Sequence, residues 1–196
     1  MNKAEFLYRF NLLQHGDSCH NYQHNLPLKS AAVLIALVNN NEPNDFTPDG
    51  LEVLLTKRAS HLKHHPSQIS FPGGKVEPTD TNLIHTALRE AHEEIGLSPN
   101  EVSVVGQLPN YEVISGYQVT PIVALVDLPQ YLQKDTNEVA EIFQVPLQHF
   151  LQPNNHRSIQ SYRNGHHHDV HFFPYKHYNI WGATAAMLKD LIEHIK

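Results

Sequence analysis

Three glutamates stand close together in the segment REAHEE, at positions 90, 93 and 94. On a helix of about 100° per residue, Glu90 and Glu94 nearly coincide and Glu93 lies about a quarter turn away. Three anions within roughly 6 Å of one another disfavour their charged forms. A divalent cation removes that penalty, and carboxylate oxygens suit Mg²⁺ or Mn²⁺. The alternative is an acidic helix face in solvent, and this short segment alone does not decide between the two.

An amphipathic helix from Asn82 to Ile95 is expected to carry these carboxylates. Gly96 follows at the position of a C-terminal cap. The apolar residues that recur at helical spacing are Leu83, Ile84, Ala87, Leu88, Ala91 and Ile95. The glutamates border this apolar face, so we expect all three at the rim of the core. Before the helix, the run from Pro72 to Gly74 predicts a tight loop whose backbone carbonyl could approach a metal.

Hydrophobic patterning and turn residues predict the remaining elements. Strands are expected at Ala31–Val38, Leu51–Thr56, Val102–Leu108, Gln118–Val126, Arg157–Tyr162 and Val170–Phe173. Helices are expected near Lys3–Leu13, Glu138–Phe143 and Gly182–Ile195. The first two strands are predicted to pair as a hairpin with a long loop, and Asn164-Gly165 predicts the turn of a second hairpin. Strands in the middle of the chain with helices around them indicate a single α+β, or mixed α/β, domain.

Composition narrows the class of protein. A chain of 196 residues suggests one domain, and 40% apolar with 17% charged residues is a globular composition. The net charge of −6 argues against a nucleic-acid binder with a broad basic surface. No apolar run reaches 18 residues and the first ten residues carry charges, so we expect neither a membrane span nor an export signal. Cys19, the single cysteine, is expected to be an unreactive thiol and fits a cytoplasmic protein. Whether the protein forms a homodimer stays open.

The wider pattern resembles the Nudix box, Gx5Ex7REUxEExGU, in which U is a bulky aliphatic residue. The residues in register are Gly74, Arg89, Glu90, Ala91, Glu93, Glu94, Gly96 and Leu97. Asp80 stands where the first Glu belongs, and eight residues instead of seven separate it from Arg89. The resemblance implies the Nudix α/β/α sandwich with a central mixed sheet over residues 30–196, preceded by an N-terminal helix and polar segment over 1–29.

The resemblance also implies roles for the residues of the box. Nudix enzymes hydrolyse a diphosphate joined to another moiety, and the three glutamates of REUxEE hold divalent metals. Glu90, Glu93 and Glu94 are therefore expected to be catalytic and to bind Mg²⁺ or Mn²⁺, with the carbonyl of Gly74 as a further ligand. Arg89 is expected to pair with the upstream acid, here Asp80, and brace the loop against the helix.

A second stretch, LLTKRASHLKHHPSQISFPGG, is similar to the signature LLTxR(S/A)x3Rx3Gx3FPGG of the coenzyme A pyrophosphatase branch of Nudix proteins. Lys63 replaces the second Arg of the signature and loses its planar fork. Ser67 replaces the Gly and is less able to adopt a positive φ. Later segments that also look like this branch are Ser115–Val126, Asn137–Leu147 and Ile180–Ile192.

The branch implies hydrolysis of coenzyme A or acyl-CoA to (acyl-)4′-phosphopantetheine and adenosine 3′,5′-bisphosphate. This substrate carries a diphosphate and a 3′-phosphate, so several cations are needed. Arg58, Lys63 and Lys75 are the expected substrate ligands. Two alternatives stay open: a Nudix pyrophosphatase for ADP-ribose or another nucleoside diphosphate derivative, and a non-catalytic nucleotide-binding Nudix domain. Domains of the latter kind usually lose glutamates of the box, and here all three are present.

Two further features have less support from the sequence. Many Nudix enzymes use a glutamate from a loop after the box as a general base or metal ligand, and Glu138, at the start of the predicted short helix, is our candidate. Glu141 and Glu112 are its rivals, and an acid is in any case favourable at a helix N-terminus. In the histidine-rich segment 166–171, His167, Asp169 and His171 would share one strand face. We expect a plain surface turn there, with a metal site as the alternative.

Overall fold

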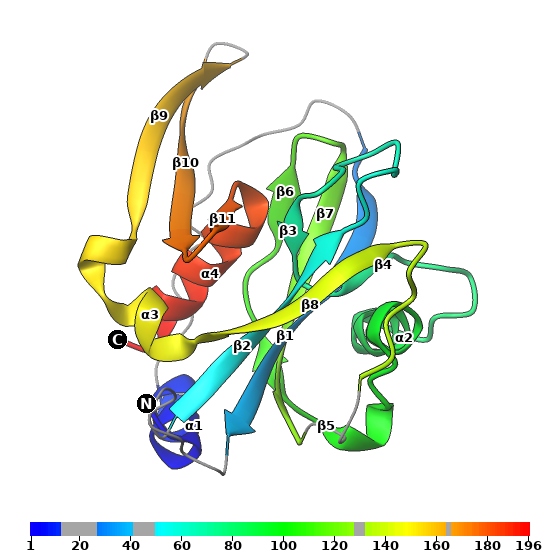
Figure 1. The fold of residues 1–196 in the computed structure, drawn as a ribbon, viewed down its shortest axis with the longest axis horizontal. Coiled ribbons are helices and arrows are strands. Elements are labelled where there is room, and N and C mark those ends of the chain that lie inside the picture. Colours follow the sequence, from blue (N-terminus) through cyan, green and yellow to red (C-terminus); the bar gives the residue numbers. More distant parts are fainter. Residues whose placement is uncertain (13–26, 41–49, 128–131, 164–165) are drawn as a thin grey trace.

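The computed structural model describes residues 1–12, 27–40, 50–127, 132–163 and 166–196, which form helices around two β-sheets (Figure 1). The helices are α1 (Lys3–Leu12), α2 (Leu83–Ile95), α3 (Leu147–Leu151) and α4 (Ala183–His194), with 3-10 turns at Pro99–Glu101 and Pro153–Asn155. The strands are β1 (Lys29–Asn40), β2 (Gly50–Arg58), β3 (Ile69–Ser70), β4 (Gly73–Lys75), β5 (Val102–Gln107), β6 (Tyr111–Val113), β7 (Tyr117–Val126), β8 (Val139–Pro146), β9 (Arg157–Arg163), β10 (His166–Tyr175) and β11 (Tyr178–Trp181). Cys19 and the Asn164-Gly165 turn lie outside the described residues.

The larger sheet is mixed and has β1 at its centre. Its order is β3-β2-β1-β7-β5, with β4 pairing on β1, β6 on β7 and β8 on β2. β1 is antiparallel to β2, which confirms the predicted pairing, and parallel to β7. The smaller sheet, β11-β10-β9, is antiparallel, and its β9–β10 pair confirms the second predicted hairpin.

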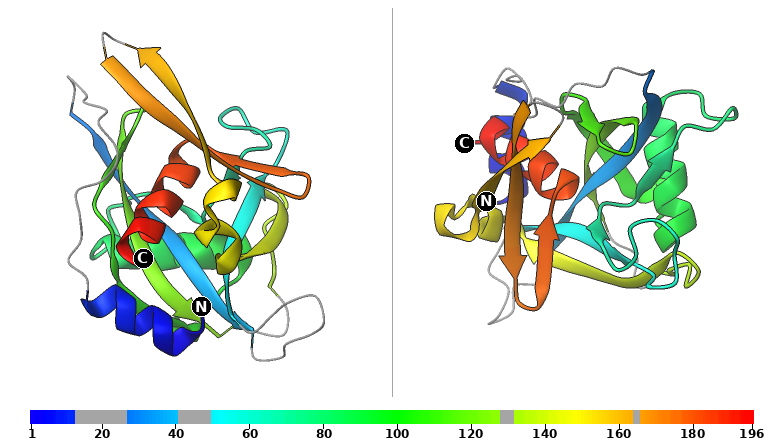
Figure 2. Two further views of the ribbon diagram at one scale, coloured as in Figure 1. Left: turned by 90° about the vertical axis from the view of Figure 1, so that its left-hand side faces the viewer. Right: turned by 90° about the horizontal axis from the view of Figure 1, so that it is seen from above.

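Helices cover both faces of the larger sheet, and the apolar run of β1 explains why. Successive side chains of a strand point to opposite faces, so a strand covered on both sides must be apolar throughout. Ile35 and Leu37 belong to the core cluster under α4, whereas Leu34 and Ala36 belong to the cluster under α2. Figure 2 shows α2 and α4 on opposite sides of the sheet. This arrangement confirms the predicted mixed α/β fold with a central mixed sheet.

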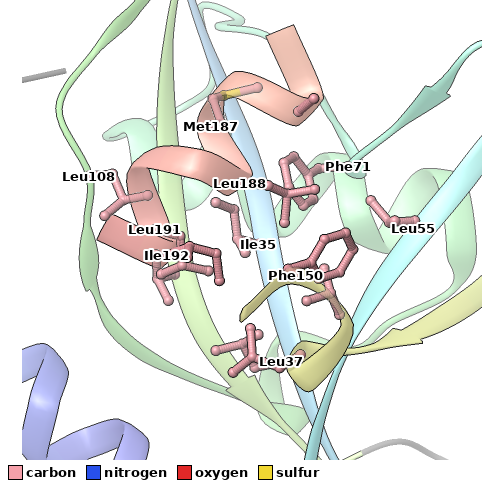
Figure 3. Close-up of a cluster of buried hydrophobic side chains, with 14 of the residues drawn as sticks. Ile35, Leu37, Leu55, Phe71, Leu108, Phe150, Met187, Leu188, Leu191 and Ile192 are labelled. Carbon is pink, nitrogen blue, oxygen red and sulfur yellow. The ribbon is translucent and has the colours of Figure 1, made fainter. Parts of the chain in front are cut away.

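The core on the α4 side is the larger of the two and also includes α1 and α3. Figure 3 shows Leu188 of α4 above Ile35, Leu191 of α4 to its left and Phe150 of α3 to its lower right. Phe6 and Phe10 bury the inner face of α1 in the same core. The predicted terminal helices are confirmed. No helix within the described ranges is long and apolar enough to cross a membrane.

Two local predictions are wrong. The segment from Glu138 to Phe143 is not a helix: Glu138 ends a turn, and β8 follows and pairs with β2 along its whole length. Long-range pairing therefore overrides the weak helical pattern of this segment. The run from Pro72 to Gly74 is not a free tight loop either, because Gly73 and Gly74 belong to β4, which pairs with β1.

Candidate active site

Helix α2 carries the three glutamates, and Gly96 ends it as the sequence predicts, whereas the cap at Asn82 was not predicted. The side chain of Asn82 accepts a hydrogen bond from the His85 N–H at 2.8 Å, which caps the N-terminus. Gly96 ends the helix in the left-handed conformation, with φ of 70°. Ala87 and Ala91 are fully buried against the sheet, and their small size allows a close approach of helix and strand. Ile84, predicted on the apolar face, is exposed instead.

The double glycine allows β4 to fit between β1 and Glu90. A Cβ atom on Gly74 would lie 2.4 Å from Glu90 Oε1, and one on Gly73 would lie 2.5 Å from the carbonyl oxygen of Ala32. Neither position can accept a side chain without moving the backbone or the carboxylate. The N–H of Gly73 also donates a hydrogen bond to the carboxylate of Glu94. The glycines therefore hold β4 directly against two of the three glutamates.

Asp80 and Arg89 form the predicted pair, despite the extra residue between them. Arg89 Nε donates to Asp80 Oδ1 at 3.0 Å and Nη2 donates to Oδ2 at 3.1 Å. The buried carboxylate also accepts hydrogen bonds from the Thr86 hydroxyl and the Glu77 N–H, both at 2.9 Å. The hydrogen bonds from Arg89 are the main reason that the pKa of Asp80 lies well below its usual range. Arg89 Nη2 also donates to the carbonyl of Lys75, so this residue braces the loop against α2.

Glu94 is buried without such a set of donors. Its side chain is 5% exposed, its Oε1 lies 3.7 Å from Arg58 Nη1, and its Oε2 has no hydrogen-bond partner among the described residues. Burial raises the pKa of Glu94 to about 8; Arg58 opposes this shift, while Glu90 and Glu138 add to it. Burial likewise raises the pKa of Glu90. A buried carboxylate with an unpartnered oxygen is costly, and a cation would satisfy it.

Glu93 differs from its two neighbours. Its side chain is 56% exposed and accepts a hydrogen bond from Arg89 Nη1 at 2.9 Å. The expectation that all three carboxylates lie at the rim of the core is therefore wrong: Glu94 is inside, Glu90 is at the rim and Glu93 points to solvent. Within the described ranges, no three Asp, Glu, His or Cys side chains converge in the geometry of a metal site. Among the described residues, Glu94 has an oxygen free for a divalent metal, whereas Glu90 and Glu93 accept hydrogen bonds from Arg89 at 3.1 and 2.9 Å and would have to share or leave that partner.

Glu138 lies in the turn before β8 and faces the buried carboxylates. Its negative charge contributes to the raised pKa values of both Glu90 and Glu94. Its carbonyl accepts a hydrogen bond from the Ala59 N–H at 2.8 Å, which fixes the turn against the end of β2. Because no helix begins here, a helix-capping role does not explain this glutamate.

The two rivals of Glu138 lie elsewhere. Glu141 belongs to β8 and accepts a hydrogen bond from the Tyr178 hydroxyl at 2.5 Å. Lys57 lies 3.8 Å from the same carboxylate, and Tyr178 stacks on Phe143, which packs against the core on the α4 side. Glu112 lies in β6, opposite Gln118 of β7. Neither rival has a contact with the α2 carboxylates that the structure describes.

The predicted substrate ligands fall into two groups. Arg58 lies next to Glu94, inside the candidate site, because it continues the face of β2 that carries Leu54 toward α2. Lys63, in the loop between β2 and β3, and Lys75, in β4, are exposed. Neither lysine forms an ion pair with another residue that the structure describes. The structure therefore brings only Arg58 directly to the carboxylates.

Sequence reasoning placed Glu138 at the start of a helix and missed Asp135, in the segment just before it. The N–H of Asp135 donates to the carbonyl of Glu94 at 2.9 Å, so this segment is tied to the end of α2. The letters DTNE contain an Asp followed two residues later by an Asn, a pattern that forms side-chain-to-backbone turns and could have indicated the feature.

The histidine-rich hairpin does not form the alternative metal site within its described part, since no group of three ligands is found there. His171 is buried, and its Nδ1 lies 3.0 Å from Nε2 of His156. Burial lowers the pKa of both rings, so the pair is suited to the neutral state.

Comparison with known proteins agrees with this geometry. The family model described as NUDIX domain matches residues 28–189. A protein of Enterobacter sp. (strain 638) named "Uncharacterized Nudix hydrolase NudL" is 40% identical over 187 residues, which cover 95% of this chain and 91% of that protein. A protein of the same name from Klebsiella pneumoniae is 36% identical over 191 residues, covering 97% and 93%.

Among solved structures, a MutT/nudix family protein from Enterococcus faecalis has a TM-score of 0.51 at 15% identity, over 98% of this chain and 68% of that one. At this identity the likeness concerns the fold alone. The family match and the relatives extend over nearly the whole chain and include the α2 glutamates. The chain therefore belongs to the Nudix family and is a hydrolase of phosphoanhydride bonds in diphosphate substrates.

Proposed function

We propose that the protein hydrolyses the diphosphate of coenzyme A or acyl-CoA to (acyl-)4′-phosphopantetheine and adenosine 3′,5′-bisphosphate. The observation that carries the proposal is the backbone of Ser67. Its φ is 59°, a left-handed conformation that favours glycine, and glycine is the residue of the coenzyme A signature at this position. For a residue with a side chain this conformation costs about 1–2 kcal/mol. The loop after Arg58 thus keeps the turn of the signature although the glycine is absent.

Glu94 and Glu90 would hold the divalent metal. Oε2 of Glu94 lacks a partner among the described residues, and the carboxylate of Glu90 occupies the space left free by Gly74. When bound, Mg²⁺ or Mn²⁺ supplies charge neutralisation at the phosphates and makes water more acidic. Glu94 must lose its proton to bind a cation, so uptake of metal near neutral pH releases protons.

Glu138 is our candidate for the general base. It is near enough to Glu90 and Glu94 for its charge to raise the pKa of both, and its backbone is fixed by Ala59. Glu138 would accept a proton from the attacking water as the water oxygen bonds to one phosphorus. The bridging oxygen then leaves with its electron pair on the other phosphate. This role needs a carboxylate within reach of the water, and the side chain of Glu138 is exposed at the edge of the site.

Arg58 and the two lysines are assigned to different phosphates. Arg58 lies 3.7 Å from Glu94, so it is suited to the diphosphate beside the metal. The sequence alone suggested Arg58 for the 3′-phosphate, and its position beside Glu94 favours the diphosphate instead. Lys63 and Lys75 are exposed and outside this cluster, and they are the cations left for the 3′-phosphate.

The substrate is tested by measuring kcat/KM for coenzyme A and for ADP-ribose with Mg²⁺ and with Mn²⁺, and by identifying the products by chromatography. We expect the higher value for coenzyme A. The reverse ranking would favour ADP-ribose or a related nucleoside diphosphate as the substrate.

The phosphate assignment is tested with coenzyme A and dephospho-coenzyme A, which lacks the 3′-phosphate. Arg58→Ala should reduce kcat/KM for both, because both contain the diphosphate. Lys63→Ala should raise KM for coenzyme A only. Lys3→Ala, on the distant and exposed surface of α1, is the matched control and should change neither.

A further inference from the structure

The turn that carries Glu138 is organised by Asp135. Oδ1 of Asp135 accepts hydrogen bonds from the backbone N–H and from Nδ2 of Asn137, each at 2.9 Å. Its carbonyl accepts from the N–H groups of Glu138 at 3.1 Å and Val139 at 2.8 Å. Asp135 therefore accepts hydrogen bonds from four N–H donors, which belong to Asn137, Glu138 and Val139.

The same turn is joined to both other parts of the site. The N–H of Asp135 donates to the carbonyl of Glu94 at 2.9 Å, and the Ala59 N–H donates to the carbonyl of Glu138 at 2.8 Å. Ala59 directly follows Arg58, which lies next to the Glu94 carboxylate. The backbone around Glu138 is thus held between the end of α2 and the end of β2.

These bonds fix the backbone, whereas the side chain of Glu138 is exposed and has no hydrogen bond among the described residues. The direction of this carboxylate is therefore set by the conformation of the turn. A displacement of about 1 Å at a reacting group can cost on the order of 10²-fold in rate. We infer that Asp135 is a positioning residue, which holds Glu138 toward the α2 carboxylates through its hydrogen bonds to Asn137.

The inference rests on the proposed role of Glu138. Asp135 is expected to affect catalysis only by positioning Glu138. Asparagine at position 135 can accept the same two hydrogen bonds through its amide oxygen, whereas alanine cannot. The negative charge of Asp135 is thus not required for these hydrogen bonds. Only its acceptor oxygen is required. Asp127, an exposed acid in the loop after β7, offers a matched control.

The test is steady-state kinetics with Mg²⁺ on Asp135→Ala, Asp135→Asn, Glu138→Gln, Asp127→Ala and the double variant of Asp135→Ala with Glu138→Gln. Coenzyme A and ADP-ribose serve in turn as substrates, so that the result does not depend on the proposed substrate. Thermal melting of each variant reports whether it is folded at the assay temperature.

Asp135→Ala should lower kcat by about 10- to 100-fold with little change in KM. Asp135→Asn should retain kcat within a few-fold. Asp127→Ala should have the same kcat as the original protein. In the double variant, Asp135→Ala should add little to the loss caused by Glu138→Gln, because residues that act as a unit are not additive.

The outcomes separate this inference from the proposed function. A further tenfold loss in the double variant, or full activity of Asp135→Ala beside an impaired Glu138→Gln, would overturn the inference and leave the role of Glu138 standing. Near-normal turnover of Glu138→Gln would overturn both. A preference for ADP-ribose over coenzyme A would overturn only the proposed substrate.

Discussion

Two carboxylate–arginine pairs flank helix α2, and they differ in almost everything except burial. Asp80 and Arg89 are joined by two hydrogen bonds of 3.0 and 3.1 Å, and the aspartate accepts two more. Glu94 and Arg58 are 3.7 Å apart, and one oxygen of the glutamate has no described partner. The pKa of Asp80 lies well below its usual range, whereas that of Glu94 is raised to about 8.

Hydrogen bonding from Arg89 is the main cause of the low pKa of Asp80, whereas burial is the main cause of the raised pKa of Glu94. Loss of water disfavours a charged carboxylate in both, but only Asp80 receives enough donors to offset that loss. The Asp80–Arg89 pair is complete and has no capacity for a ligand, so its role is to hold the loop on the helix. The Glu94–Arg58 pair is incomplete, and its missing interaction is one that a cation can supply. Perturbed carboxylates of this kind are typical of functional sites.

The largest expected effect follows from removing the charge at Glu94. Glu94→Gln should lower kcat by about 10³-fold or more, because the metal loses a ligand whose contribution is several kcal/mol in the transition state. Folding should be preserved, since the amide avoids a buried charge. Glu93→Gln is the partner variant: the family role of this residue predicts a loss of similar order, although its side chain points to solvent here.

Steady-state kinetics and calorimetric titration with Mg²⁺ check both variants. Near-normal turnover of Glu94→Gln would mean that its unpartnered oxygen has no role in catalysis. Near-normal turnover of Glu93→Gln alone would mean that the hydrogen bond to Arg89 persists in the working enzyme.

Disrupting the Asp80–Arg89 pair should instead lower the stability of the folded protein. Asp80→Ala leaves Arg89 partly buried without its main partner, and loss of one member of a buried pair costs about 3–5 kcal/mol. We expect a decrease of that order in the free energy of unfolding, measured by urea denaturation. Glu77→Gln, in the same loop but exposed, is the control and should stay within about 0.5 kcal/mol. A loss below about 1 kcal/mol for Asp80→Ala would remove the distinction between the pairs.

The sequence predicts α2 well because independent local signals coincide there. The predicted start at Asn82 and end before Gly96 are confirmed, although Ile84, one of the predicted apolar residues, is exposed. The strand β1 was equally clear from its uninterrupted apolar run. The pairing of Arg89 with Asp80 could also be predicted, although only through the resemblance to the Nudix box.

The incomplete pair could not be predicted, because it depends on contacts between distant segments. Arg58 meets Glu94 only because its face of β2 is the one that α2 covers. The neighbours Glu93 and Glu94 have the same side chain, yet Glu93 is exposed and Glu94 is buried beside Arg58. Glu138 was predicted as a candidate but on a helix, because the pairing of β8, which follows it, with β2 is a long-range feature.

The raised pKa of Glu94 predicts a pH dependence of stability for the metal-free protein. Between the ordinary pKa near 4.5 and the folded value of about 8, the folded state keeps a proton that the unfolded state has lost. Stability should therefore fall as pH rises through this window, by about 1.4 kcal/mol per unit. From pH 6.5 to 8 the expected decrease is about 2 kcal/mol.

The histidines whose pKa values are lowered by burial act mainly below this range. Urea denaturation in the presence of a chelator is the measurement, and Glu94→Gln should remove the slope. Adding Mg²⁺ should stabilise the protein more at pH 8 than at pH 6.5, because the ionised form binds the metal. If stability rose from pH 6.5 to 8, and Glu94→Gln removed that rise, the result would contradict the difference in pKa between the two pairs.

The smallest expected effect is the change in the free energy of unfolding for Arg58→Lys, which we compare with Arg89→Lys. Arg58→Lys keeps the charge, and the 3.7 Å contact with Glu94 offers no aligned hydrogen bond that could be lost. The free energy of unfolding should change by less than about 1 kcal/mol. Arg89→Lys is the matched variant, and it loses a fork that serves both oxygens of Asp80 together with the carbonyl of Lys75.

Urea denaturation of the two lysine variants under the same conditions compares them directly. The loss should be clearly larger for Arg89→Lys, because a lysine at position 89 leaves buried acceptors of Asp80 unsatisfied. Equal losses would mean that the geometry around Arg58 is as specific as that around Arg89. In that case the unpartnered oxygen of Glu94 would not indicate an incomplete site, and the argument for a cation would rest on Glu90 and Gly74 alone.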